Sequence, residues 1–307
     1  MSAIVCAYTM SRLGELSRAV ESLENQSRPV DEIIVVIDNN RELMAVASER
    51  FTSAIVVENA GARGLSTARN TGVALATGDV IFFLDDDATA AEDWIERILA
   101  VYADSRAVGV GGRVEPVWPG LRPSWFPEEF DWVVGCSYRG LPEQTAEVRN
   151  MIGANMSFRK EVFDTVGEFS AEIGRVGTKP LGCEETEFCI RVRRVIGAPI
   201  VYEPSARISH LVTEERAGRR YFISRCYMEG LSKAVVVRLE GAGDGLSSER
   251  TYTTRVLPRG IMRGLADVVA RRELSGFVRA FWISLGVAIT TAGYLRGSVA
   301  AKLNENT

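Results

Sequence analysis

The chain has 307 residues, of which 46% are hydrophobic and 25% charged, and its formal net charge is -4. This composition is typical of a folded globular protein and excludes an intrinsically disordered one, and the length allows one large domain or two small ones. The five cysteines include no C-x-x-C pair and the first apolar run is not preceded by a secretory signal, so we expect no disulfide framework, no structural zinc site and a cytoplasmic location.

The first half of the sequence alternates short apolar runs with amphipathic segments, a pattern that predicts a parallel sheet covered by helices. We expect strands at 3–8, 32–37, 55–58 and 80–84, and helices at 13–26, 41–50, 67–76 and 92–102. Polar residues follow all four strands, beginning with Tyr8, Asp38, Asn59 and Asp85. Because the carboxyl ends of parallel strands meet at one edge of a sheet, a nucleotide could lie there.

The fourth strand runs directly into three acids, Asp85, Asp86 and Asp87. Side chains alternate along a strand, so Asp85 and Asp87 should point to one side and Asp86 to the other. Two carboxylates on one side can share a hard cation such as Mg²⁺ or Mn²⁺, with a substrate diphosphate completing its coordination. The alternative is an acidic turn that caps the helix beginning near Glu92.

Two features after the second and third strands suit a nucleotide. Asp38 can accept hydrogen bonds from a base or ribose, although it is also a candidate N-cap for the helix beginning at Arg41. Residues 61–64, Gly-Ala-Arg-Gly, place backbone N–H groups and Arg63 near a helix start, which suits an anionic diphosphate. Arg69, inside that helix, either points to the nucleotide or ties the helix to its neighbour.

The middle of the chain is less regular. A strand is expected at 108–114 and another at 151–158, followed by a helix from Lys160. Between them, residues 115–150 form an insertion rich in Pro, Gly and Trp, which is more typical of a functional lid or acceptor loop than of a linker. Its side chains Trp118, Trp125 and Trp132 either pack over a sugar or lipid chain or form a satellite hydrophobic cluster.

Further acids and the single histidine follow. After a glycine-rich loop at 174–182, a helix begins with Glu184, Glu185 and Glu187, which either compensate the helix dipole or include a general base with a tuned pKa. His210 ends an expected strand at 206–209. An isolated histidine is usually structural, but the end of a strand in a chain with a paired-carboxylate site makes His210 a candidate metal ligand.

Taken in order, the runs at 5–9, 37–40, 59–70 and 84–87 resemble family 2 glycosyltransferases over residues 1–235. The resemblance implies an α/β fold of the GT-A (Rossmann-like) type, with a mixed, mainly parallel sheet, helices on both faces and a C-terminal helical extension. It implies a domain at 1–239, divided into a nucleotide-binding half (1–114) and an acceptor half (115–239), and a separate segment at 240–307.

Three shorter matches are more specific. Residues 126–130 with Trp132, 153–159 and 184–189 resemble the glucosyl-dolichyl-phosphate glucuronosyltransferase group, whose acceptors are polyprenyl-phosphate-linked sugars. The resemblance makes Asp38 the nucleotide-base contact and places Arg63 and Arg69 in the nucleotide-binding loop. Tyr8 and Asp86, at the same edge of the expected sheet, complete the set of residues that we assign to the nucleotide.

The resemblance also implies a metal site and a base. Asp85 and Asp87 fall on the family's D-x-D motif, with Asp87 as the direct metal ligand and Asp85 nearer the ribose or a metal-bound water. His210 falls where some relatives place a third contact to metal or diphosphate. Glu185 falls at the catalytic-base position of the E-D-x-[DE] motif, where glutamate replaces aspartate and moves the carboxylate about one bond outward.

These assignments imply an inverting transferase that needs Mn²⁺ or Mg²⁺ and a nucleotide-sugar donor, most simply a UDP-sugar. Glu185 would take the proton from an acceptor hydroxyl as it attacks the anomeric carbon. The expected acceptor is a glycan linked to polyprenyl phosphate or otherwise presented at a membrane surface, and not a nucleic acid. The alternatives are a soluble small-molecule acceptor and a catalytically silent GT-A binding module. A dehydrogenase or nucleotidyltransferase is disfavoured because no G-x-G-x-x-G turn follows the first strand.

The C-terminal segment differs in charge from the rest. From 255 to 302 the net charge is +6, which leaves -10 for the remainder. Helices are expected at 221–239 and 252–272, and the uncharged stretch at 280–295 would span only about 24 Å as a helix, short of the ~30 Å hydrocarbon core. We therefore expect residues 255–302 to make peripheral contact with the inner face of the cell membrane, or to mediate a homodimer; the other alternative is an ordinary buried helix.

Overall fold

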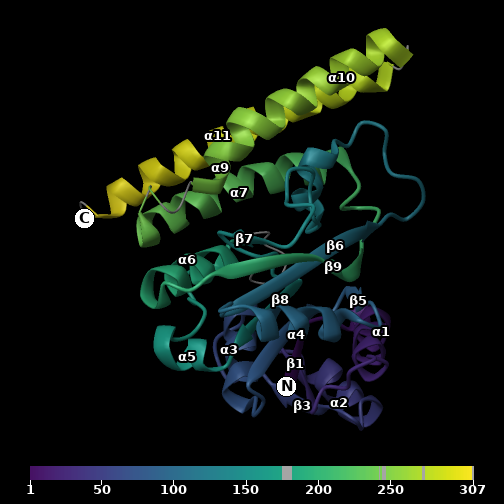
Figure 1. Cartoon of the computed structure of the whole chain (residues 1–307), viewed down its shortest axis with the longest axis vertical. Coiled ribbons are helices and arrows are strands. Elements are labelled where there is room, and N and C mark those ends of the chain that lie inside the picture. The colour runs from purple at the N-terminus through teal and green to yellow at the C-terminus, as the bar shows by residue number, and fades with distance from the viewer. Residues whose placement is uncertain (175–181, 242, 244–246, 272–273, 306–307) are drawn as a thin grey trace. The chain divides into compact units, whose positions relative to one another are not determined.

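The structure is a computed structural model that describes the whole chain except residues 175–181, 242, 244–246, 272–273 and 306–307 (Figure 1). Most of the glycine-rich loop expected at 174–182 therefore lies outside the described residues. The chain divides into two compact units. Unit 1 comprises Met1–Glu115, Pro142–Lys179 and Glu184–His210, and unit 2 comprises Pro116–Leu141, Pro180–Cys183 and Leu211–Thr307. The functional boundary expected at residue 239 stays a prediction.

The first four strands form the parallel half of the sheet, as the sequence predicts. They are β1 (Ser2–Ala7), β2 (Glu32–Ile37), β3 (Ile55–Glu58) and β4 (Val80–Asp85). β1 pairs in parallel with β2 and with β4, and β2 pairs in parallel with β3. Ala7 lies opposite Ile37, and Ile37 lies opposite Glu58, so the strands end together. The polar residues after these strands are therefore brought to one edge of the sheet.

The second half of the sheet is antiparallel. It contains β5 (Ala88–Ala90), β6 (Gly109–Val117), β7 (Ala146–Val148), β8 (Asn155–Arg159) and β9 (Ile200–Leu211). Within the described residues the strand order is β3-β2-β1-β4-β8-β6-β9-β5, and β7 also pairs with β9. The short strands β5 and β7 have no counterpart in the sequence analysis, and β9 is much longer than the expected strand at 206–209. The expectation of a mixed sheet is confirmed.

Helices cover both faces of the sheet in unit 1. They are α1 (Leu13–Glu24) after the short helix η1 (Met10–Arg12), α2 (Arg41–Arg50), α3 (Leu65–Leu75), α4 (Trp94–Asp104), α5 (Glu161–Val166) and α6 (Glu184–Ile196). Ile81 and Met156 share a buried cluster with Phe188 of α6. Phe82, which points the other way along the same strand, packs against Trp94 of α4 at 5.4 Å between ring centroids.

Unit 2 is helical. It contains η2 (Glu128–Val134), α7 (Arg219–Glu240), α9 (Ser247–Thr251), η3 (Tyr252–Val256), α10 (Leu257–Arg271) and α11 (Leu274–Glu305). Its core is aromatic: Trp125 packs on Phe222 of α7 and on Trp282 of α11, with centroids 5.7 and 4.6 Å apart. Trp132 donates a hydrogen bond to the Tyr252 hydroxyl over 3.0 Å. The tryptophans of the insertion thus take part in a hydrophobic cluster, one of the two alternatives left open by the sequence.

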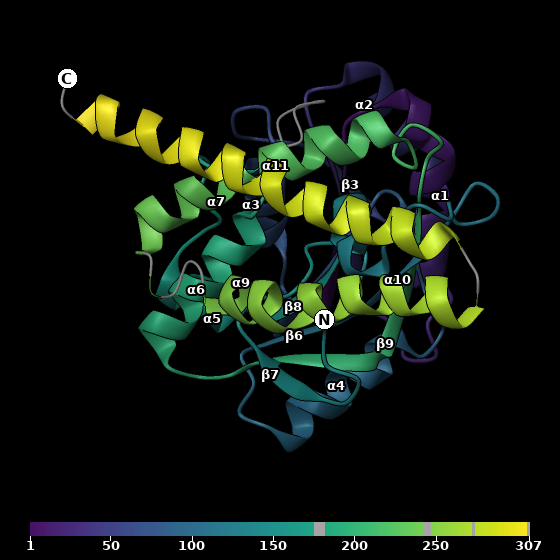
Figure 2. The same ribbon diagram turned by 90° about the horizontal axis from the view of Figure 1, so that it is seen from above.

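The last helix, α11, is longer than the uncharged stretch expected at 280–295. It also includes Arg279 and Arg296, which flank that stretch. Within α11, residues Leu274–Ala300 are long and apolar enough to cross a membrane, with a mean hydropathy of 1.4. Length and composition are weak evidence on their own, since core helices can pass the same test. Figure 2 shows α11 and α10 lying side by side, and α11 also packs on α7.

Candidate active site

The three expected metal ligands lie together in unit 1. β4 ends at Asp85, the chain turns through Asp86 and Asp87 into β5, and β5 pairs with β9 so that Ala88 lies opposite His210. One ligand atom each from Asp85, Asp87 and His210 falls within 4.8 Å of the other two. Nε2 of His210 lies 2.7 Å from Oδ1 of Asp87. Two carboxylates and one imidazole form a donor set that fits Mn²⁺ or Mg²⁺.

Arg12, which nothing in the sequence singled out, lies against this acidic turn. Nη1 of Arg12 donates to Oδ1 of Asp86 over 2.8 Å and lies 3.2 Å from Oδ2 of Asp87. Burial raises the pKa of Asp86 to about 7, although Arg12 favours its charged form. Oδ2 of Asp86 is buried and accepts no hydrogen bond within the described residues. Asp86 thus faces Arg12, and its assignment to the nucleotide stays a prediction.

Asp38 organises the loop that follows the third strand. It is buried, and its Oδ1 accepts from Nδ2 of Asn59 over 2.7 Å while its Oδ2 accepts from the N–H of Gly64 over 3.1 Å. The N-cap of α2 is Asn40, which accepts from the N–H of Leu43, so Asp38 is not the cap. Asp38 shapes residues 59–64, and its contact with the nucleotide base stays a prediction.

Arg69 is buried, with 2% of its surface exposed. Its Nη1 donates to Oε1 of Glu184 over 2.7 Å, and its Nη2 reaches Oδ1 of Asp85 at 3.4 Å and the carbonyl oxygen of Gly153 at 3.2 Å. Coulombic attraction from Glu184 and Asp85 raises the pKa of Arg69 against the opposing effect of its burial. Arg69 therefore ties α3 to its neighbours, the second of the two roles considered for it; contact with the nucleotide stays a prediction.

The three acids in the first turn of α6 differ in burial and in their hydrogen-bond partners. Glu184 is held by Arg69, and Glu187 lies 2.7 Å from Nε of Arg191. Both are buried, whereas Glu185 is half-buried and accepts from the Thr186 hydroxyl over 3.1 Å. Glu185 is thus the most accessible carboxylate of the three. This geometry is compatible with the base role expected for Glu185, which stays a prediction.

The remaining expected nucleotide contacts lie at the same edge of the sheet. Tyr8 follows β1, and the guanidinium of Arg12 lies 5.8 Å from the centre of its ring. Arg63 is exposed in the loop that precedes α3. Both side chains belong to unit 1, as do the candidate metal ligands. Their assignment to the donor stays a prediction.

Known proteins resemble this chain in sequence and in fold. The chain matches the family model described as glycosyl transferase family 2 over residues 2–167. It is 34% identical over 311 residues to the glucosyl-dolichyl phosphate glucuronosyltransferase of Haloferax volcanii, an alignment that covers 100% of this chain and 99% of that protein.

Solved structures are similar to the chain over nearly its whole length. The mannosyltransferase PcManGT from Pyrobaculum calidifontis, in complex with GDP-Man and Mn²⁺, has a TM-score of 0.61 and 17% identity and covers 100% of this chain and 87% of its own. S. aureus TarS in complex with UDP-GlcNAc has a TM-score of 0.52 and 14% identity, with coverages of 99% and 92%. The chain therefore belongs to glycosyl transferase family 2, has the GT-A fold and is a glycosyltransferase.

Proposed function

We propose that the chain transfers a sugar from a UDP-sugar to a hydroxyl of a sugar linked to polyprenyl phosphate, in one metal-dependent inverting displacement. The observation that carries this proposal is the convergence of Asp85, Asp87 and His210 within 4.8 Å at the carboxyl edge of the sheet. Carboxylate-rich metal sites of this kind suit a substrate diphosphate, because the protein leaves coordination positions for phosphate oxygens.

Asp85, Asp87 and His210 would hold the cation, which when bound neutralises the negative charge that develops on the departing nucleoside diphosphate. Arg12 lies within ion-pair distance of both Asp86 and Asp87, so it reduces the repulsion between these two neighbouring acids. Asp38 and Gly64 keep the loop at 59–64 in place, and Arg63 of that loop would bind the diphosphate.

Glu185 would act as the general base. Its carboxylate would accept the proton of the acceptor hydroxyl as the oxygen of that hydroxyl forms a bond to the anomeric carbon and the bond to the diphosphate breaks. The burial of the three acids supports this choice, since Glu184 and Glu187 are buried whereas Glu185 is partly exposed. A positioned base typically contributes about 10²- to 10⁴-fold in rate.

The proposed acceptor follows the Haloferax volcanii relative, whose name specifies glucuronosyl transfer to glucosyl-dolichyl phosphate. Identity of 34% along the whole chain supports the same acceptor class, a sugar on a polyprenyl phosphate, presented at the inner face of the membrane. The donor is less constrained, because the two similar structures were solved with GDP-Man and with UDP-GlcNAc. A UDP-sugar, with UDP-glucuronate as the first candidate, is our proposal.

The test is nucleotide release from UDP-, GDP- and dTDP-sugars, each with Mn²⁺, Mg²⁺ or EDTA, for the wild type and Asp87→Ala. We expect metal-dependent release from a UDP-sugar that the substitution abolishes. A second assay adds glucosyl-dolichyl phosphate or a soluble glucoside, with and without detergent. Faster release with the lipid alone supports the proposed acceptor, whereas equal stimulation by the soluble glucoside favours a soluble acceptor. Failure to release or bind any nucleotide would indicate a silent binding module.

A further inference from the structure

One face of α11 is exposed along most of its length and carries large apolar side chains towards both ends. Leu274, Phe277 and Phe281 are 77%, 60% and 54% exposed, and Leu295 and Val299 are both 59% exposed. Spacings of three and four residues place these side chains on one side of the helix. The exposed residues between Phe281 and Leu295 on this side are small or uncharged. An apolar surface of this length on a folded protein marks a contact with a partner or a membrane.

The opposite face of α11 packs closely on α7. A Cβ added to Gly230 would meet the carbonyl oxygen of Thr290, one added to Gly293 would meet that of Tyr227, and one added to Gly297 would meet Ala234 at 2.7 Å. These three contacts fall at successive turns of both helices, so the two run together without room for lipid between them. Glycine permits this close approach because it has no side chain.

The same stretch of α7 is charged. Glu229 lies 2.7 Å from Nη1 of Arg225 and 3.1 Å from Nζ of Lys233. If α11 crossed a bilayer, the helix packed along it would carry these three ionised side chains into hydrocarbon, at a cost of several kcal/mol. The structure therefore argues against a membrane-spanning α11, although its length and hydropathy would allow one. Only the exposed face of α11 can meet lipid.

α10, which packs beside α11, also exposes apolar and basic side chains. Met262 is 68% exposed, and Arg259 lies three residues before it on the same side of α10. Arg255, in the preceding helix η3, is also exposed. Among the described side chains from 255 to 300, every charged one that is exposed is an arginine. Anionic lipid head groups complement this charge, whereas a second copy of the chain would present the same positive surface.

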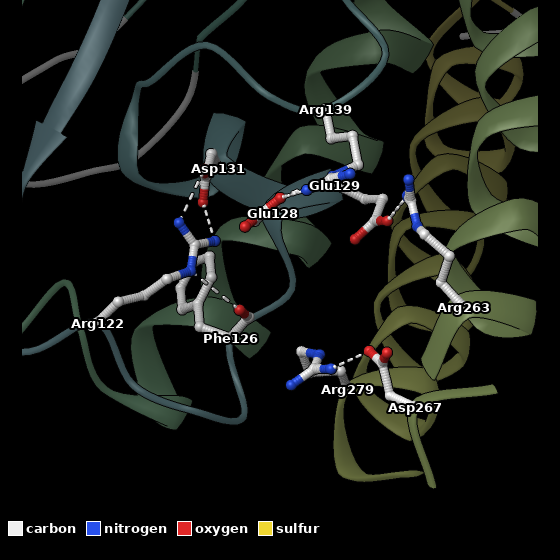
Figure 3. Close-up of polar contacts among 9 residues, drawn as sticks. All are labelled: Arg122, Phe126, Glu128, Glu129, Asp131, Arg139, Arg263, Asp267 and Arg279. Atoms are coloured by element: carbon white, nitrogen blue, oxygen red, sulfur yellow. Dashed lines mark hydrogen bonds and ion pairs between the residues drawn. The ribbon is translucent and has the colours of Figure 1, made fainter. Parts of the chain in front are cut away.

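Ion pairs hold the two helices in place, as Figure 3 shows. Arg263 of α10 pairs with the buried carboxylate of Glu129 in η2. Arg279 of α11 donates to Oδ2 of Asp267 in α10 over 2.7 Å. Arg263 and Arg279 thus stabilise the α10–α11 hairpin, whereas Arg259 and, in η3, Arg255 are exposed.

We propose that α10 and α11 form a membrane-docking surface that lies in the head-group region of an anionic bilayer, parallel to its plane, with Phe277, Phe281 and Met262 inserted among the lipids. The surface belongs to unit 2 and its docking requires no sugar transfer. It deepens the proposed function because it would bring the enzyme to a lipid-linked acceptor. A helix with an apolar face and a basic flank typically binds membranes in this orientation.

The test is co-flotation of the full chain with phosphatidylcholine vesicles, with and without phosphatidylglycerol. We expect the wild type to bind the anionic vesicles and to be released by alkaline carbonate. The double variant Phe277→Ser/Phe281→Ser should lose about tenfold or more of its vesicle binding. Arg255→Gln and Arg259→Gln should each reduce binding to anionic vesicles about fivefold without affecting neutral ones. Leu121→Ser, which removes a 97% exposed leucine outside α10 and α11, is the matched control and should bind normally.

Other outcomes would overturn the proposal. Resistance to carbonate would mean that α11 spans the bilayer. No flotation, together with a dimer that the double phenylalanine variant dissociates, would identify the surface as a contact between copies. Equal binding by the wild type and the double variant would place lipid contact elsewhere. Nucleotide release, measured without lipid on the same proteins, should be unchanged, so a failure of docking can be told apart from a failure of the transferase.

Discussion

Arg69 donates a 2.7 Å hydrogen bond to Glu184 at the first residue of α6, and the same guanidinium reaches Asp85 at the end of β4. A buried positive charge thus joins the expected metal side of the site to the helix that carries the expected base. Because Arg69 and Glu184 are both buried, neither can lose its partner without leaving an uncompensated charge.

Arg69→Met should therefore destabilise the fold by about 3 to 5 kcal/mol. Arg69→Met combined with Glu184→Gln should be less destabilised than the sum of the single variants, with a coupling energy of about 1 to 3 kcal/mol. Urea denaturation of the wild type, Arg69→Met, Glu184→Gln and the double variant measures this coupling. Simple additivity would mean that the ion pair does not hold these elements together.

Glu185→Gln should reduce the transfer rate about 10²- to 10⁴-fold while donor and Mn²⁺ binding stay near normal, since the substitution removes a proton acceptor and preserves shape. Glu185→Asp restores the residue type usual at this position of the family motif and should keep far more activity. Single-turnover rates and nucleotide affinity, measured on both variants, provide the check. Near-normal turnover by Glu185→Gln would require another base.

His210→Ala should raise the Mn²⁺ concentration needed for half-maximal activity by about 10-fold or more. Mutation of a residue that only supports a metal ligand already weakens metal affinity by about 10- to 100-fold, and loss of a ligand should cost at least as much. The reason is that His210 supplies one of the three candidate ligand atoms. Ser209→Ala, at the preceding exposed position of β9, is the control. If the Mn²⁺ titrations of the two variants coincide, His210 only supports Asp87.

Glu229 should make stability depend on pH in the acid range. Burial alone would raise its pKa, but Lys233 and Arg225 outweigh this effect and lower the pKa from 4.5 to about 2. The folded state therefore binds fewer protons than the unfolded state between these values, so the stabilisation is complete above about pH 4.5 and is lost as the pH falls towards 2. The contribution is about 3 kcal/mol. Denaturation curves across this range should have a smaller pH slope for Glu229→Gln than for the wild type.

Gly230→Ala should destabilise unit 2 by about 1 to 3 kcal/mol, because the added methyl group would meet the backbone of α11. Alanine is the better helix former by about 1 kcal/mol, so a stabilised variant would show that α7 and α11 are not in close contact. Gly120→Ala, with no atom within 4 Å of the added Cβ, is the neutral control. Thermal unfolding of both variants decides between the outcomes.

The elements with strong periodicity could be predicted from sequence. β1 to β4 and the helices between them lie close to the expected bounds, because apolar runs bounded by polar turns leave few alternatives. β5 could not be predicted, since three residues of Ala-Thr-Ala contain no periodic signal. Its partner β9 extends from Ile200 through a proline and several polar residues, which hid its length.

The residues of the candidate site could be proposed from the sequence, but the contacts between them could not. The D-x-D spacing indicates that Asp85 and Asp87 face one way, yet His210 reaches Asp87 only through the antiparallel pairing of β5 with β9. Arg12 was missed because nothing in the sequence near it points to the acids at 86 and 87. Asp38 and Asn40 are both good caps by type, and the hydrogen bond from the N–H of Leu43 to the Asn40 side chain shows that Asn40 takes that role.

The pairing of β5 with β9 also limits how the chain can be divided. The segment that the family model matches ends at residue 167, before β9 begins. A fragment cut there would lose His210 and would leave the strand edges of β5 and β6 without their partner, which exposes unpaired backbone groups to aggregation. Shortened or chimeric versions of the chain should therefore retain residues 88–90 and 200–211 from the same parent, because these two segments pair with each other across more than a hundred intervening residues.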